Sequence, residues 1–152
     1  NSPGADRLGD ANYSDVQWWL EIYTALGATG VNATVAVEYN DGSTGNLAAI
    51  ALGATPRAGR LYPLISAVAG KFIRAVTGVT LSATTGTAGN FGITATRSRT
   101  SVSAPLLNKT EVSDWAQLGL PNIPNDSCLM MLMLRATTST GTMRGQGKIA
   151  HG

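Results

Sequence analysis

The 152-residue sequence is short of charged side chains, cysteine and histidine. Only 13% of its residues are charged, about half the share of an average globular chain. Cys128 is the single cysteine, so no disulfide can form within the chain. His151 is the single histidine and lies beside the last residue, which argues against Ser-His-Asp or Cys-His catalysis and against a zinc site.

Long apolar runs and secretion signals are also missing. No run approaches the roughly 18 apolar residues that span a bilayer, so no membrane partner is expected. The composition also argues against intrinsic disorder, because 43% of the residues are hydrophobic and the net charge is only +2.

Threonine, serine, alanine and glycine take the place of the missing charge, in patterns typical of β-strands. Apolar and polar residues alternate over 79–84 and again over 91–95. Gly86, Gly89 and Asn90 lie between them and tolerate the positive φ of a turn. We therefore predict a β-hairpin with a loop of four to five residues, and a fainter copy of it over 132–150.

Further strands are predicted at 16–25, 33–39, 47–52, 61–65, 72–76, 128–135 and 142–150. Pro63 marks 61–65 as an edge strand, because proline cannot donate to a ladder. Residues 128–135 are apolar on both faces, which predicts a central strand that buries Cys128. Residues 110–118 have helical spacing, with Thr110 as a cap.

These elements predict an all-β chain: a two-sheet sandwich of about eight strands with one short helical insert near 110–118. A jelly roll is favoured by the strand count, and an immunoglobulin-like sandwich is the alternative. Residues 1–15 show no periodicity and are expected to form an extended N-terminal arm. Residues 16–152 are expected to form a single β-sandwich domain.

The charges are unevenly distributed along the chain. Residues 1–41 hold six acidic residues and one basic residue, whereas 42–110 hold seven basic residues and no acidic one. The two blocks either form separate patches that meet on neighbouring subunits or interleave within one sheet. Because the basic residues are dispersed, we do not expect nucleic acid as a partner.

No combination of residues predicts catalysis, a cofactor or a metal site, so we expect a protein that is not an enzyme. Glu21 and Glu38 lie on candidate neighbouring strands, but solvated strand faces explain this pair of carboxylates better than glycoside hydrolysis does. Asp41 precedes Gly42, which indicates a turn more often than a calcium ligand.

Three segments together carry a resemblance: residues 32–42 (NATVAVEYNDG), 58–64 (AGRLYPL) and 76–94 (VTGVTLSATTGTAGNFGIT). They resemble small virion proteins encoded among the structural genes of tailed bacteriophages. The resemblance implies a capsid decoration (cement) subunit that assembles in the bacterial host cytoplasm and becomes part of the virion. Its partners would be other copies of itself and a viral capsid or tail protein.

Two alternatives stay open at this point, a tail or fibre component and a carbohydrate-binding module. The latter needs exposed tryptophan, and Trp18 and Trp19 point to opposite faces of their strand, so at most one of them could serve. For the assembly subunit, the candidate subunit-interface residues lie in the arm, at a pair of alternating arginines and in the insert. They are Asp6, Arg7, Leu8, Asp10, Tyr13, Arg97, Arg99, Trp115 and Leu118.

Overall fold

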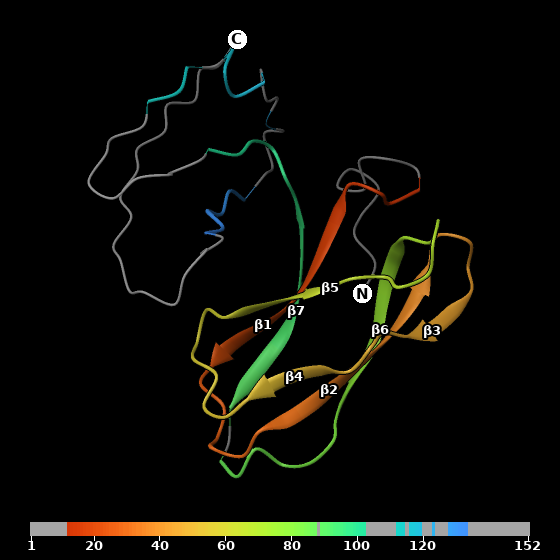
Figure 1. The fold of residues 1–152 in the computed structure, drawn as a ribbon, viewed down its shortest axis with the longest axis vertical. Helices are drawn as coiled ribbons and strands as arrows, with labels where there is room; N and C mark the ends of the chain where they lie inside the picture. The colour runs from red at the N-terminus through yellow and green to blue at the C-terminus, as the bar shows by residue number, and fades with distance from the viewer. Residues whose placement is uncertain are drawn as a thin grey trace. The chain divides into compact units, whose positions relative to one another are not determined.

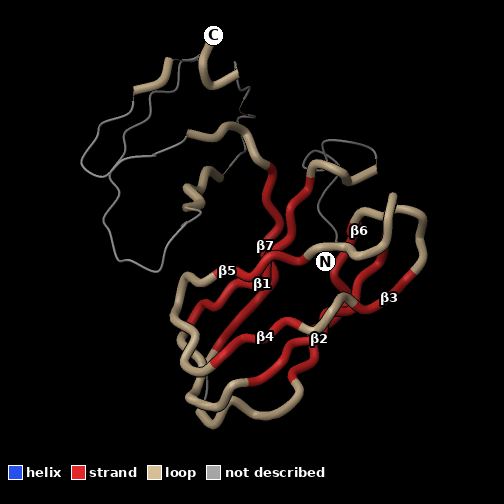
Figure 2. The backbone as a smooth tube through the Cα atoms, viewed as in Figure 1, coloured by secondary structure: helices blue, strands red, loops and turns tan. Residues whose placement is uncertain are grey.

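The computed structural model describes residues 12–87, 89–102, 112–114, 116–119, 123 and 128–133, and these contain seven β-strands and no helix (Figures 1 and 2). The strands are β1 (Val16–Thr24), β2 (Val31–Tyr39), β3 (Thr44–Asn46), β4 (Ile50–Gly53), β5 (Leu61–Leu64), β6 (Ile73–Leu81) and β7 (Asn90–Arg97). No helix in this part of the chain is long and apolar enough to cross a membrane.

The first sheet has the order β5-β1-β7, with both pairings antiparallel. The alternation in β1 turns Trp18, Leu20 and Ile22 toward the core. As the position of Pro63 predicts, β5 lies at one edge of this sheet. At the other edge, β7 pairs with β1 along its length, from Arg97 opposite Val16 to Asn90 opposite Thr24.

The second sheet is built around β2, which has β6 on one side and both β3 and β4 on the other. Every second residue of β2 is buried, and Ala33, Val35 and Val37 have no exposed surface. The ladder between β2 and β6 shifts register twice, between Ala36 and Val37 and between Glu38 and Tyr39.

Two buried hydrogen bonds join the sheets across the core. The Trp18 indole of β1 donates to the Ile73 carbonyl of β6 at 2.9 Å. The Tyr62 hydroxyl of β5 donates to the Leu52 carbonyl of β4 at 2.6 Å. Each bond satisfies a polar group that would be costly to bury alone. The prediction of an all-β, two-sheet arrangement is therefore confirmed.

The predicted hairpin over 79–95 is wrong. Its two halves are strands, but β6 pairs with β2 in one sheet and β7 pairs with β1 in the other. The intervening segment, with Gly86 at φ 88°, crosses from sheet to sheet. An alternating pattern identifies a strand and its buried face, but it is indifferent to which strand pairs with it.

The chain divides into two compact units, residues 1–121 and residues 122–152, and all seven strands belong to the first. In the second unit, residues 128–133 form no strand and are mostly exposed, Cys128 included, so the predicted buried central strand is not found there. Apolar composition alone predicted that strand. The predicted strand at 142–150 and most of the copy over 132–150 lie outside the described residues.

The predicted helical turns at 110–118 are reduced to a single turn over 114–119 in the described part of this insert. Asp114 caps this turn: its carboxylate accepts from the Gln117 amide at 2.8 Å, and the Gln117 side chain accepts from the Asp114 amide at 3.2 Å. The predicted cap, Thr110, lies outside the described residues. Gly119, at φ 78°, ends the turn.

Candidate interaction surface

The segment 65–72, which connects β5 to β6, exposes three large apolar side chains. Ile65 is 71% exposed, Val68 46% and Phe72 36%. We call this segment the apolar loop. Three exposed apolar side chains within eight residues make this segment a candidate contact surface for another molecule.

The apolar loop is shaped by short-range hydrogen bonds. The Ser66 hydroxyl accepts from the Val68 amide at 3.2 Å and donates to the Val68 carbonyl at 3.3 Å. The Lys71 amide donates to the same carbonyl at 3.2 Å, across Gly70 at φ 72°. This turn chemistry fixes the backbone that carries Val68.

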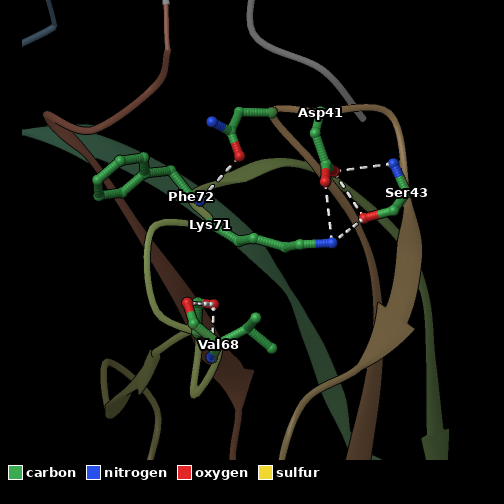
Figure 3. A network of polar contacts seen from close by, with 7 residues as sticks. Asp41, Ser43, Val68, Lys71 and Phe72 are labelled. Carbon is green, nitrogen blue, oxygen red and sulfur yellow. Dashed lines mark hydrogen bonds and ion pairs between the residues drawn. The ribbon is translucent and has the colours of Figure 1, made fainter.

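Lys71 ties the apolar loop to the turn between β2 and β3 (Figure 3). Its ammonium lies 2.9 Å from Asp41 Oδ2 and donates to Ser43 Oγ at 2.7 Å. Asp41 Oδ1 in turn accepts from the Ser43 amide at 3.0 Å and from the Ser43 hydroxyl at 2.6 Å. The same ammonium lies 5.4 Å from the centre of the Tyr39 ring.

A second attachment lies next to the first. The Asn40 amide donates to the Phe72 carbonyl at 2.9 Å, and the Phe72 amide donates to Asn40 Oδ1 at 3.1 Å. Figure 3 shows the Phe72 ring directed away from the Lys71 ammonium. The apolar loop is thus held in place before any partner arrives, which reduces the entropy lost on association.

Asp41 is kept charged at this junction. Hydrogen bonding from the Ser43 hydroxyl, reinforced by Lys71, holds the pKa of the Asp41 carboxyl far below its usual range. The carboxylate therefore orders a turn, which agrees with the turn prediction made for this residue. Among the described residues, no three His, Cys, Asp or Glu side chains are grouped so that they could hold a metal ion.

The candidate interface residues from the sequence are only partly within the described residues. Asp6, Arg7, Leu8, Asp10 and Trp115 lie outside them. Tyr13 is half-buried, with φ at 65°, and its carbonyl accepts from the Val16 amide at 3.2 Å. Since Val16 faces Arg97 in the ladder, the structure brings Tyr13 and Arg97 to the same end of the β5-β1-β7 sheet.

Arg97 is engaged within its own chain. Its Nε donates to Asp15 Oδ2 at 2.8 Å, so the guanidinium already has an acidic partner in its own chain. Arg99 is half-exposed and takes part in no ion pair among the described residues. The neighbouring Thr100 hydroxyl donates to the Leu118 carbonyl at 3.1 Å. This bond joins the segment that follows β7 to the turn that carries Leu118.

The acidic and basic blocks of the sequence interleave within the chain. All three ion pairs of the described residues join an acid of the first 41 residues to a base of the 42–110 block. They are Asp41 with Lys71, Glu38 with Arg74, and Asp15 with Arg97. Of the two readings of the charge pattern, these contacts support interleaving over separate patches.

The tryptophans of β1 do not form a sugar-binding platform. Trp18 is 4% exposed, in the core, and Trp19 is 9% exposed on the opposite face, where its indole donates to Thr96 Oγ1 at 2.7 Å.

Glu21 and Glu38 were expected on neighbouring strands, but β1 and β2 lie in different sheets. Glu21 accepts from the Thr94 hydroxyl and Glu38 pairs with Arg74.

The sequence does not single out the apolar loop as a candidate surface. The turn signal at Asn40 and Asp41 was visible, but nothing in the sequence showed that this turn meets a segment 30 residues later. The only local signal was the Gly70-Lys71 pair, which follows the apolar residues Ile65 and Val68.

No family model, curated protein or solved structure matches this chain.

Proposed function

We propose that this chain is a non-enzymatic structural subunit of a bacteriophage virion, and that it decorates the capsid by binding across neighbouring capsid proteins. The observation that carries the proposal is the apolar loop, which exposes Ile65, Val68 and Phe72 on a backbone fastened by Lys71 and Asn40. The sequence resemblance to phage virion proteins supplies the biological setting.

The physical basis of such a role is repeated burial of modest surfaces. A large apolar side chain that passes from water into an interface contributes about 1.5–3 kcal/mol. Copies that bind side by side on one shell gain further from multivalency, so a small apolar loop is sufficient. The low charge of the chain suits this role, because interface cores are depleted of charged residues.

The test is binding to particles of the encoding phage that lack this protein. We expect Ile65→Asp and Phe72→Asp each to weaken binding at least about tenfold, since a buried carboxylate replaces apolar contact. Val102→Asp is the matched control, because Val102 is also exposed (56%) but lies outside the apolar loop. Sedimentation with particles measures binding, and circular dichroism verifies that each variant is folded.

Binding of all three variants at the wild-type level would remove the apolar loop from the proposal. Failure of the wild-type chain to bind any part of the particle would overturn the proposed function itself. Electron microscopy of bound particles distinguishes a head site from a tail or fibre site.

A further inference from the structure

Among the described strands, β6 and β7 are the two long strands whose outer edges pair with no other strand. β7 ends the β5-β1-β7 sheet, and no described strand pairs with its outer side over the eight residues from Asn90 to Arg97. An edge of this length offers a row of backbone donors and acceptors to another strand.

The two edges of this sheet are protected differently. β5 has only four residues and contains Pro63, which has no backbone amide to donate to a further strand on the outer side. β7 contains no proline and no lysine, and its one charged residue, Arg97, stands at the end and pairs with Asp15. Unprotected edges of this kind are typical of strands that pair with another chain.

The side chains beside this edge are incompletely covered. Leu20 and Ile22 of β1 have no exposed surface, but the β7 residues directly opposite them, Ile93 and Phe91, are only partly buried. Ala95, on the same face, is exposed. Among the described strands, none continues the apolar face of the sheet beyond β7.

We propose that β7 pairs antiparallel with β7 of a second copy, which joins two three-stranded sheets into one of six strands. A second copy is the partner because the strand is complementary to itself. With Ile93 opposite Ile93 of the partner subunit, each Phe91 faces an Ala95 and each Gly92 faces a Thr94, so apolar residues meet on one face and small residues on the other.

The charges also favour this register. The two Arg97 side chains then lie four residues on either side of the two-fold axis, about 26 Å apart, which is beyond effective repulsion in salt. A register centred on Thr94 would instead place each Arg97 opposite a Phe91 and lose one of the apolar matches. The interface is small, so we expect a dimer that dissociates at about micromolar concentration.

The inference rests on the proposed function only in that an assembly subunit contacts its own copies. It is tested in solution without particles, by sedimentation over a concentration series in the Cys128→Ser background, which prevents adventitious disulfides. We expect wild-type chain to dimerise, and Ala95→Lys to weaken the dimer at least about tenfold because an inward-facing lysine blocks edge pairing. Ala51→Lys is the control, since Ala51 is an exposed alanine of β4 in the other sheet.

Hydrogen exchange of the β7 amides that point away from β1 completes the test, because the other β7 amides already donate within the ladder to β1. Protection of these outward amides that appears only at concentrations where the dimer forms supports the proposal. A monomer at every concentration, a dimer unaffected by Ala95→Lys, or outward amides already protected in the monomer would each overturn it, the last by showing that another segment of the same chain occupies the edge. If the monomeric Ala95→Lys variant still binds particles, the proposed function stands without the dimer. If the chain forms the dimer but binds no particle, the dimer stands and the proposed function fails.

Discussion

At the scale of single residues, Tyr62 links the two sheets through one buried hydrogen bond to the Leu52 carbonyl. Tyr62→Phe removes the donor and leaves that carbonyl without its partner, so we expect the free energy of unfolding to fall by about 1–2 kcal/mol. Urea unfolding followed by tryptophan fluorescence measures the change. Tyr23→Phe is the control, because Tyr23 is 49% exposed and should change stability by less than about 0.5 kcal/mol. Equal losses in both variants would contradict the assigned role.

Gly27 is required by the close approach of two loops at one end of the sandwich. A Cβ at this position would lie 1.9 Å from the Thr85 carbonyl oxygen, so the backbone itself must move. We expect Gly27→Ala to lower the free energy of unfolding by about 3 kcal/mol. Gly78→Ala is the matched control: a Cβ there meets nothing within 4 Å, and a strand favours alanine over glycine. Thermal unfolding of the two variants tests the difference, and a stable Gly27→Ala protein would show that the contact relaxes at little cost.

Asp41 gives the apolar loop a dependence on pH. Because the pKa of the folded carboxyl is lowered, its stabilising contacts with Ser43 and Lys71 are fully present above the ordinary aspartate pKa of about 4. They are lost only as the pH falls toward the folded value. We expect the NMR signal of the Ser43 amide, which donates to Asp41, to titrate with a midpoint well below 4. A midpoint near 4 would contradict the assignment, and Asp41→Asn should abolish this titration.

At the scale of elements, the sequence predicts strands better than it predicts their partners. The alternation over 16–25 and 33–39 corresponds to β1 and β2, and Pro63 correctly marks an edge. The sequence predicts β6 as two separate strands, at 72–76 and from residue 79. The reason is that its core-facing residues follow the register shifts near Val37 and Tyr39 and do not keep a spacing of two.

The candidate surface was less predictable than the strands for a related reason. The apolar loop is held by contacts between Asn40 or Asp41 and residues about 30 positions away, and such contacts depend on how β2 and β6 pair. Local patterns report backbone propensity and buried faces, but they carry no information on which turns meet. From the sequence, the acidic and basic blocks could either form separate patches or interleave. Only the strand pairing shows that they interleave.

At the scale of the whole molecule, the topology predicts slow folding. β1 pairs with β5 and β7, which follow it by about 40 and 70 residues, and the adjacent strands β6 and β7 belong to different sheets. Loops of this size must close before their contacts stabilise the chain, so we expect folding on the scale of milliseconds to seconds. Stopped-flow tryptophan fluorescence, which reports the burial of Trp18 and Trp19, measures the rate. Complete folding within microseconds would contradict this topology.

The pairing of Val16 with Arg97 has a mechanical consequence. The chain enters the β5-β1-β7 sheet and leaves it at adjacent positions on antiparallel strands, so tension between the two flanking segments would reach the ladder at one end. The ladder would then unzip one residue pair after another, the geometry that resists force least, because the hydrogen bonds are not loaded together. We therefore expect the sheet to resist tension between its two flanking segments less than it resists shear along its strands.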